Sequence, residues 1–286
     1  MAWTLGKPLV AVDHVHAHLY SVRLNDAPPS YSPSPSPPLV SAGWGEGPHG
    51  HPKNTPHPSP LPAYRERGQK EIPFPAIGLV CSGGHTALYH LRDWLNIDLI
   101  GSTLDDAVGE AYDKAAAILN LGYPGGPRID ALASAGNPKS IKFPRSLLGR
   151  DSLDFSFSGL KTALLYHVRG FKGRQHDARK LSPPELADIC AAFQAACVDV
   201  LVEKIRRATR RFNARSVIVG GGVSANSGLR AALANFDRPV YFPPLQYCTD
   251  NAAMIAALGH QLLAAGRTSG LDLDAITHSQ FADAPR

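Results

Sequence analysis

The amino-acid sequence predicts an α/β protein built mainly around one sheet. Short apolar runs separated by turn residues predict strands, and longer runs with apolar side chains every three or four positions predict helices. The expected strands are residues 76–82, 86–91, 97–102, 216–219 and a short one near 238–242. The expected helices run from about Asp105 to Leu121, from Pro184 to Arg211, between the last two strands, and from about Asp250 to Ala265. This order is typical of one half of the ribonuclease-H-like fold that actin-like ATPases and sugar kinases share.

The segment before this body predicts a fragment of a second half of the same kind. Residues 8–13 are expected to form a short buried strand, and His14 to Leu24 a helix that Asp13 caps. Two loop-rich stretches, 123–127 and 153–162, interrupt the main body. In the complete fold, two halves face each other with a nucleotide between them. The sequence therefore predicts one complete half-domain and part of the other.

Proline, serine, glycine and histidine dominate the residues between these two parts. Such a composition buries too little apolar surface to offset the entropy that ordering would cost. We therefore expect three regions. They are a remnant of the first half-domain with a histidine-rich helix over 1–26, a disordered Pro/Ser-rich insert over 27–73, and the second half-domain with nucleotide-binding loops over 74–286.

Composition limits the class of protein. The chain has 286 residues, 44% of them hydrophobic, which is enough for a sizeable core. No apolar run approaches the roughly 18 residues that a membrane span needs, and the first seven residues lack a signal-peptide pattern. The four cysteines form no CxxC pair, which favours a reducing, cytoplasmic location over a disulfide framework.

The chain carries a formal net charge of +5. A mild positive charge suits a polyanion such as RNA, but it is also common among proteins that bind none. Arg206, Arg207, Arg210 and Arg211 cluster on the long predicted helix. They form either a solvated ridge or one that follows a phosphate backbone, and the sequence leaves both interpretations open.

Two histidines at the start of the first predicted helix suggest a metal site. His14 and His18 are four positions apart and share one helix face, whereas His16 points elsewhere. This spacing suits two imidazoles on one metal ion, and the alternative is a helix that is rich in histidine by chance. Asp250, at the start of the last helix, can complete the set from across the cleft. Two imidazoles and one carboxylate favour Fe(II) or Zn(II).

Glycine-rich turns follow two of the predicted strands. Gly83 and Gly84 come directly after the first strand, and Gly220–Gly222 separates a later strand from a helix. Such turns let backbone N–H groups approach a phosphate, although ordinary turns also use glycine. Asn226 can hydrogen-bond an adenosine, and the rigid turn around Gly126 can place that glycine against a ribose.

Acidic residues line the helix expected after the third strand. Asp106, Glu110 and Asp113 share one face by their spacing. They form either a solvated acidic face or the border of a packed surface, since alanines lie among them.

Together, these motifs resemble the TsaD family of bacterial tRNA threonylcarbamoyladenosine synthases, whose older description is O-sialoglycoprotein endopeptidase or glycoprotease. The matching segments follow the family's order over nearly the whole chain outside the insert. They are His14–His18, Ser82–Thr86, Asp105–Lys114, Tyr123–Pro127, Asp154–Thr162, Gly220–Asn226 and Cys248–Asn251.

The resemblance implies an acyltransferase that moves the threonylcarbamoyl group of threonylcarbamoyl-AMP to N6 of adenosine 37 in tRNAs reading codons that begin with A. It implies one divalent metal, Fe(II) ahead of Zn(II), on His14, His18 and Asp250. It makes Glu110 a candidate for orienting groups near the metal. The implied partners are tRNA, a TsaB-like paralogue and a small TsaE-like ATPase, without a membrane. The implied substrate-binding residues are Val80, Cys81, Ser82, Gly83, Gly84, Asp113, Gly126, Asp130 and Asn226.

The sequence departs from the family pattern in two places. His16-Ala17 stands where the family usually has Glu-Gly, next to the expected metal ligands. The family's long segment before the equivalent of Lys7 has no match here. We therefore expect most of the first half-domain to be missing, and the chain alone to transfer weakly or not at all.

Three functions compete on these grounds. The first is the tRNA-modifying transferase, and the second is a non-catalytic scaffold that binds the same partners. The third is a metalloendopeptidase, which the family's older name suggests. The pentad His14–His18 contains no HExxH motif, so no glutamate follows His14 as a general base. The transferase is therefore the main expectation and the scaffold the main alternative.

Overall fold

The computed structural model describes residues 2–24, 71–149, 151–170 and 181–275. Residues 1–25 and 72–286 belong to one compact unit. The predicted insert, 27–73, lies almost entirely outside the described residues, as do the histidines within it.

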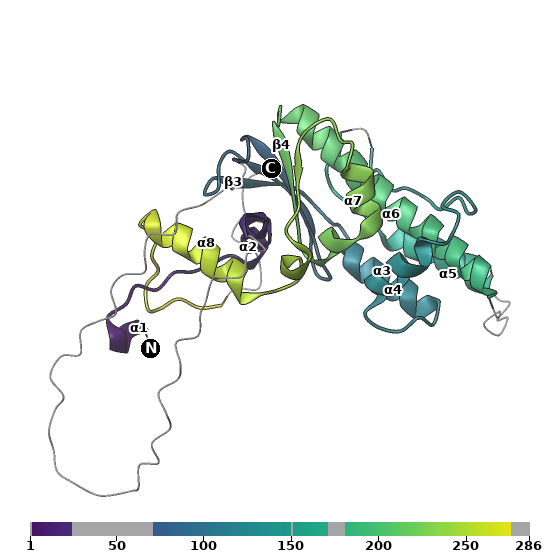
Figure 1. The fold of residues 1–286 in the computed structure, drawn as a ribbon, viewed down its shortest axis with the longest axis horizontal. Helices are drawn as coiled ribbons and strands as arrows, with labels where there is room; N and C mark the ends of the chain where they lie inside the picture. Colours follow the sequence, from purple (N-terminus) through teal and green to yellow (C-terminus); the bar gives the residue numbers. More distant parts are fainter. Residues whose placement is uncertain (1, 25–70, 150, 171–180, 276–286) are drawn as a thin grey trace, which may run out of the picture. The chain divides into compact units, whose positions relative to one another are not determined.

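A five-stranded mixed sheet lies at the centre of this unit, in the order β3-β2-β1-β4-β5 (Figure 1). β1, β2 and β3 pair antiparallel, as expected of strands joined by short turns. β4 and β5 extend the sheet in parallel with β1. This order confirms the predicted fold class. The strands are β1 (Ala76–Cys81), β2 (Thr86–Leu91), β3 (Ile97–Ser102), β4 (Ser216–Gly220) and β5 (Val240–Tyr241).

Helices and short 3-10 turns connect these strands. None of the helices in the described ranges is long and apolar enough to span a membrane. The helices are α1 (Ala2–Leu5), α2 (His14–Tyr20), α3 (Val108–Ile118), α4 (Gly125–Ala133), α5 (Ser158–Arg169), α6 (Pro183–Arg211), α7 (Ser227–Leu233) and α8 (Ala252–Ala264). The 3-10 turns are η1 (Ser21–Arg23), η2 (Gly222–Ala225) and η3 (Leu245–Tyr247).

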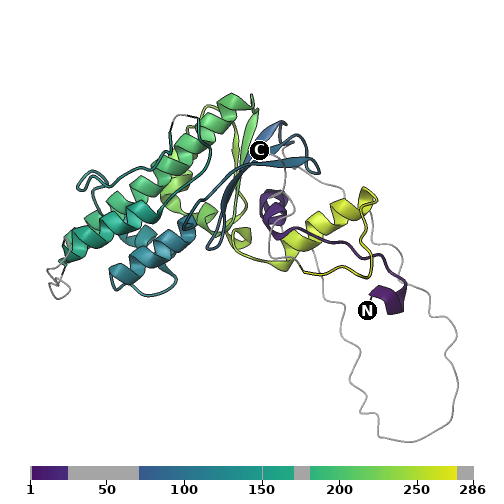
Figure 2. The ribbon, with the colours of Figure 1, turned by 180° about the vertical axis from the view of Figure 1, so that it is seen from behind.

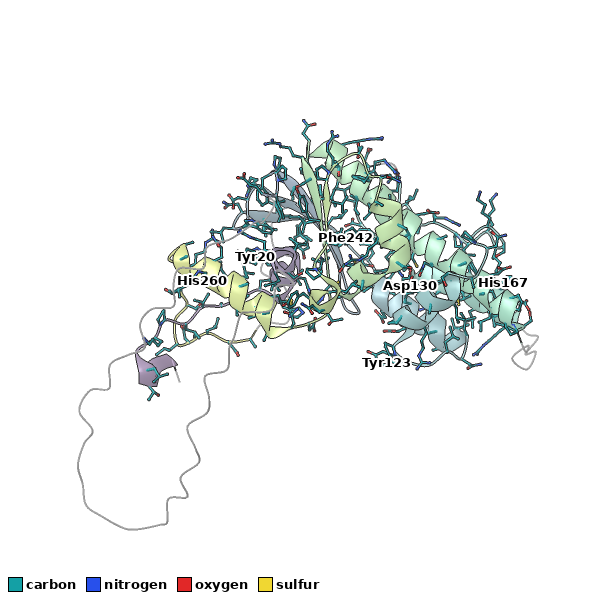
Figure 3. The ribbon with its side chains drawn as sticks, in the orientation of Figure 1. Tyr20, Tyr123, Asp130, His167, Phe242 and His260 are labelled. Atoms are coloured by element: carbon teal, nitrogen blue, oxygen red, sulfur yellow. The ribbon has the colours of Figure 1, made fainter. Side chains whose placement is uncertain are left out.

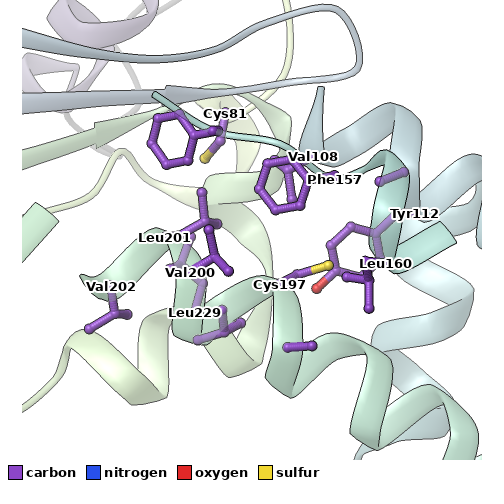
Figure 4. Close-up of a cluster of buried hydrophobic side chains, with 14 of the residues drawn as sticks. Cys81, Val108, Tyr112, Phe157, Leu160, Cys197, Val200, Leu201, Val202 and Leu229 are labelled. Carbon is purple, nitrogen blue, oxygen red and sulfur yellow. The ribbon is translucent and has the colours of Figure 1, made fainter. Parts of the chain in front are cut away.

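The sheet carries helices on both faces (Figures 1 and 2). Successive side chains of a strand point to opposite faces. Ile77 and Leu79 therefore join the larger core with α3, α5 and α6, part of which Figure 4 shows. Ala76 and Val80 pack against α2 on the opposite face. All six residues of β1 are buried, as is typical of a strand covered on both sides.

The long helix α6 forms much of the wall of the larger core. Ser182 is its N-cap and Pro183 occupies the first turn, where a missing N–H costs nothing. Near its other end, Lys204 is buried, and its Nζ donates to the carbonyl oxygens of Leu147 at 2.8 Å and Ser152 at 2.7 Å. Burial, followed by repulsion from Arg207, lowers the pKa of Lys204 to about 8. These hydrogen bonds attach Leu147 and Ser152 to the helix.

The N-terminal helix α2 packs on the sheet beside α8. It can approach the sheet closely because Gly220 ends β4. A Cβ at Gly220 would collide with the carbonyl oxygen of His18. The glycine turn after β4 therefore serves a packing role as well as any ligand-binding role, because it fixes where His18 lies.

Residues 8–13 do not form the predicted strand, and this expectation was wrong. Among the described residues, Leu9 alone of this segment makes a β-bridge, to Ser269. Ala11 N also donates to the Ser269 hydroxyl at 3.1 Å. An apolar run becomes a strand only where a neighbouring strand offers hydrogen bonds along its length. Contacts with Ser269 alone, beyond the end of α8, do not supply them.

Helices also occupy the two stretches that the sequence predicts as loop-rich. α4 begins at Gly125 and α5 at Ser158. Glycine, proline and serine favour turns, but they are also frequent in and just before first helical turns, where the helix does not yet need interior residues. Their presence therefore predicted loops at the positions where both helices begin.

α3 begins later than expected, at Val108. The chain turns before it, because the Thr103 hydroxyl donates to the carbonyl oxygen of Asp106 at 2.8 Å. Val108 N donates to the Thr86 hydroxyl at 2.8 Å, which satisfies one of the free N–H groups of the first turn. Asp105 and Asp106 therefore lie in a turn rather than along the helix.

Candidate functional site

Two histidine side chains on α2 meet one carboxylate from the segment before α8. The Asp13 side chain caps α2, as predicted, by accepting a hydrogen bond from His16 N at 2.8 Å. The helix then places His14 and His18 next to each other, with ring centroids 4.8 Å apart. Asp250 approaches both rings from the other end of the chain.

The distances among these three side chains suit a metal ion. Asp250 Oδ1 lies 3.3 Å from His14 Nε2 and 3.1 Å from His18 Nε2. One ligand atom from each residue lies within 4.8 Å of the other two. Metal–ligand bonds of about 2.1 Å, at angles between square and tetrahedral, separate neighbouring ligand atoms by about 3.0–3.4 Å. The two His–Asp distances therefore match two edges of a coordination polyhedron.

The environment of His18 also fits a metal ligand. The side chain is buried, and Nε2 faces Asp250 Oδ1 at 3.1 Å. A buried imidazole that faces a carboxylate suits a bound cation, which would satisfy both groups. Burial, followed by repulsion from His14, lowers the pKa of His18. Its ring is therefore neutral, as a metal ligand must be.

A cavity of about 400 Å³ lies at the ends of β1 and β4, within the size range of small-ligand sites. Its walls come from the turn after β1, from α3, from the start of α4 and from the segment after β4. Five of the nine predicted substrate-binding residues line it. These are Gly83, Asp113, Gly126, Asp130 and Asn226. Figure 3 shows Asp130 and Tyr123 on the side of the sheet that carries α3 and α4.

The other four predicted substrate-binding residues do not line this cavity. Val80 and Cys81 are fully buried within β1, on opposite faces of the sheet. Ser82 and Gly84 lie in the turn that follows, which Ser82 closes by accepting a hydrogen bond from His85 N at 3.1 Å. These residues shape the turn that presents Gly83 to the cavity.

Two carboxylates of the cavity wall are held by backbone N–H groups. Asp113 Oδ1 accepts from Gly125 N at 2.7 Å, which joins α3 to the start of α4. Asp130 accepts from the N–H of Ser227 at 3.1 Å and from its hydroxyl at 2.7 Å, which joins α4 to the start of α7. The wall therefore consists of helices fixed to one another beside the cavity.

Glu110 does not line the cavity. It pairs with Lys114 at 2.8 Å, and Lys114 also contacts Asp106 at 2.6 Å. Asp106 in turn pairs with Lys161 at 3.1 Å. Burial tends to raise the pKa of Asp106, but hydrogen bonds from both lysines lower it overall. The acidic face expected at 106, 110 and 113 is therefore divided, and only Asp113 faces the cavity.

Further cavity residues lie outside the substrate set that the sequence predicts. Tyr112 precedes Asp113 on α3, and Tyr123 stands beside the glycine turn with 79% of its surface exposed. Both tyrosines lie within the matching motifs, close to predicted substrate-binding residues, and this position could have identified them. Thr249 also lines the cavity, and the next residue, Asp250, contacts both histidines. The candidate metal centre and the cavity are therefore neighbours along the chain.

The sheet order, the turns after β1 and β4, and the cavity between them define a protein of the actin-like ATPase and sugar-kinase class. Full-length HypF, in its phosphate- and nucleotide-bound form, shares this fold with a TM-score of 0.58. The likeness covers 94% of this chain and 45% of that one at 13% sequence identity, and it concerns the fold alone.

Within this class, the chain belongs to the TsaD family of transferases. The model of this family, tRNA N6-adenosine threonylcarbamoyltransferase, matches residues 61–257. A relative of that name from Anaeromyxobacter dehalogenans is 41% identical over 280 residues, which cover 96% of this chain and 68% of the relative. Another, from Syntrophotalea carbinolica, is 46% identical over 211 residues, which cover 72% and 60%. The predicted family is thus confirmed.

Proposed function

We propose that this chain carries the metal centre and adenylate site for transferring the threonylcarbamoyl group of threonylcarbamoyl-AMP to N6 of adenosine 37 in tRNA. One observation carries this proposal: Thr249 lines a cavity of nucleotide size, and the adjacent Asp250 belongs to the His-His-Asp cluster. A reacting carbonyl at one end of an adenylate would then lie near the metal.

In this proposal, His14, His18 and Asp250 hold Fe(II) or Zn(II). Such an ion, when bound, supplies Lewis-acid stabilisation for charge on the carbamoyl and phosphate oxygens. Asp130 and Asp113 hold the ribose hydroxyl groups, and their hydrogen bonds to backbone N–H groups keep them in place. The exposed ring of Tyr123 offers a face for stacking a base.

The transfer balances as an acyl substitution. The new bond joins N6 of adenosine to the carbamoyl carbon, and N6 loses a proton to solvent. The bond from that carbon to the phosphate oxygen breaks, and AMP leaves with its electron pair. The chain's task is to hold the two reactants in line and to keep the adenylate oriented while AMP forms.

The proposal includes the partners that the sequence predicts. They are tRNA, a TsaB-like paralogue and a small TsaE-like ATPase, acting in the cytoplasm. The net charge of +5 supports an RNA partner. A scaffold that binds the same partners without catalysis is the alternative.

The test is a transfer assay in two arms, with the purified chain alone and with both protein partners added. Threonylcarbamoyl-AMP and an unmodified tRNA that reads an A-starting codon are the substrates. In the arm with both partners we expect threonylcarbamoyladenosine in nuclease digests of the tRNA, measured by liquid chromatography and mass spectrometry. The chain alone should give little or none, and a tRNA with guanosine at position 37 should give none in either arm. Partner binding without product in either arm would contradict the transferase and favour the scaffold.

A further inference from the structure

Gln194 lies on α6, behind the wall of the cavity. Its side chain is 7% exposed and does not line the cavity itself. A buried amide needs hydrogen-bond partners, because leaving its polar atoms unpaired costs free energy. Its partners all line the cavity: they are Asp130, Asn226 and Tyr112, whose hydroxyl donates to Gln194 Oε1 at 3.5 Å.

Gln194 connects Asp130 and Asn226 directly. Its Nε2 donates to Asp130 Oδ1 at 2.9 Å, and its Oε1 accepts from Asn226 Nδ2 at 2.8 Å. Asn226 Nδ2 also donates to Asp130 Oδ1 at 3.1 Å. The three side chains thus form a closed triangle that joins α4, α6 and the cap of α7.

The direction of each hydrogen bond in this triangle is fixed by groups that cannot reverse. Asn226 Oδ1 accepts from Leu229 N at 2.9 Å, so its NH₂ group must face Gln194. The oxygen of Gln194 must then face Asn226, and its NH₂ group must face Asp130. An ionised carboxylate only accepts, so Asp130 matches this orientation.

The triangle also assigns different tasks to the two cavity residues. Asn226 bonds to other protein groups on both sides of its amide. Its Nδ2 donates to Asp130 and Gln194, and its Oδ1 accepts from Leu229 N. Asp130 Oδ1 accepts from Gln194, Asn226 and the Ser227 hydroxyl, whereas Oδ2 accepts only from Ser227 N among the described residues. Oδ2 therefore keeps acceptor capacity for a hydroxyl group in the cavity.

We propose that Gln194 is a positioning residue for ribose recognition. It fixes Asp130 through Oδ1, so that Oδ2 remains available to accept a hydrogen bond from a ribose hydroxyl of the bound nucleotide. Asn226 supports the same carboxylate through its Nδ2. This inference rests on the proposed role of the cavity as a nucleotide site.

The test compares AMP with 2′,3′-dideoxy-AMP, which lacks both ribose hydroxyl groups. Calorimetry gives the Kd of each ligand for the wild-type chain, for Gln194→Glu and for Gln194→Met. Gln194→Glu keeps the acceptor for Asn226 and loses the donor to Asp130, and Gln194→Met loses both at a similar side-chain volume. The control is Cys190→Ala, which removes a buried atom from the same helix within the larger core.

The readout is the ratio of the two Kd values, because a merely structural defect would weaken both ligands equally. We expect the wild type and Cys190→Ala to prefer AMP by at least about tenfold, since one hydrogen bond to a charged group is worth about that much. Both Gln194 variants should lower this ratio several-fold, to the part that Asp113 supplies. A ratio that stays at the wild-type value in either variant overturns the inference about Gln194 but not the nucleotide site. Absence of AMP binding by the wild type overturns the nucleotide site and the inference with it.

Discussion

His14 and His18 belong to the same cluster, but they differ in what surrounds them. The His18 side chain is 1% exposed and the His14 side chain 46% exposed. A water molecule can replace the exposed ligand, but it cannot easily replace a buried imidazole. The two histidines should therefore contribute unequally to metal affinity.

We expect His18→Ala to lower metal affinity at least about tenfold, and His14→Ala to lower it less. The measurement is the metal content of anaerobically purified protein by mass spectrometry, followed by competition with a chelator. His260→Ala, which removes an exposed histidine from α8, is the control and should retain the wild-type content. Equal metal content in His18→Ala and the control would contradict a metal site at this cluster.

Single residues also show how much of the candidate site can be predicted from the sequence alone. The spacing of His14 and His18 predicts their shared face, because a helix repeats locally. Asp250 needed the family resemblance as well as its place before a helix, because no local rule brings the two ends of the chain together. Gln194 had no signal at all. Its partners come from α3, α4 and the cap of α7, and a polar residue on a long helix is usually expected to face solvent.

At the level of elements, Gly220 couples β4 to α2. A side chain at this position would collide with the carbonyl oxygen of His18, so Gly220→Ala should push α2 away from the sheet. We expect the variant to bind metal several-fold more weakly than the wild type and to lose about 1–3 kcal/mol of stability, since backbone must move to admit the methyl group. Metal titration and urea unfolding measure the two effects.

The matched control for this variant is Gly159→Ala on α5. A Cβ there meets no atom within 4 Å, so the variant should keep both metal affinity and stability. If Gly220→Ala behaves like Gly159→Ala, the close packing of α2 on β4 does not set the metal geometry.

Regular elements were the best predicted part of the fold. The strands and α6 begin and end within about two residues of their expected limits, because long periodic patterns outweigh local exceptions. The expected strand at 8–13 failed, since pairing depends on partners that the segment itself does not encode. α4 and α5 were missed because their first turns consist of residues that also favour loops.

On the scale of the whole molecule, buried thiols make stability depend on pH. Cys81 on β1 and Cys197 on α6 lie in the same core, and burial raises the pKa of both thiols well above the ordinary range. Burial also raises the pKa of Cys190 to about 12. In the unfolded chain these thiols lose their protons above about pH 9, whereas the folded chain retains them. The stabilisation is therefore complete below pH 9 and is lost as the pH rises further.

We expect the free energy of unfolding of the wild type, relative to Cys197→Ala, to fall between pH 9 and pH 11. The slope should reach about 1.4 kcal/mol per pH unit, which corresponds to one proton. Urea unfolding at pH 8, 9, 10 and 11 measures it. Lys204, whose lowered pKa acts in the opposite direction, is present in both proteins and cancels. A constant difference across this range would contradict a thiol that stays protonated in the core.

The contact between Ala11 and Ser269 joins positions 258 residues apart in the chain. At a synthesis rate of about 5–20 residues per second, the ribosome releases these two segments tens of seconds apart. The hairpins of β1, β2 and β3 involve only neighbouring segments and can form early. Helix α2, made before the sheet, must keep its apolar face exposed until β4 has emerged, and its histidines must await Asp250 longer still. A ribosome that stalls before Asp250 therefore releases a product without the third residue of the His-His-Asp cluster.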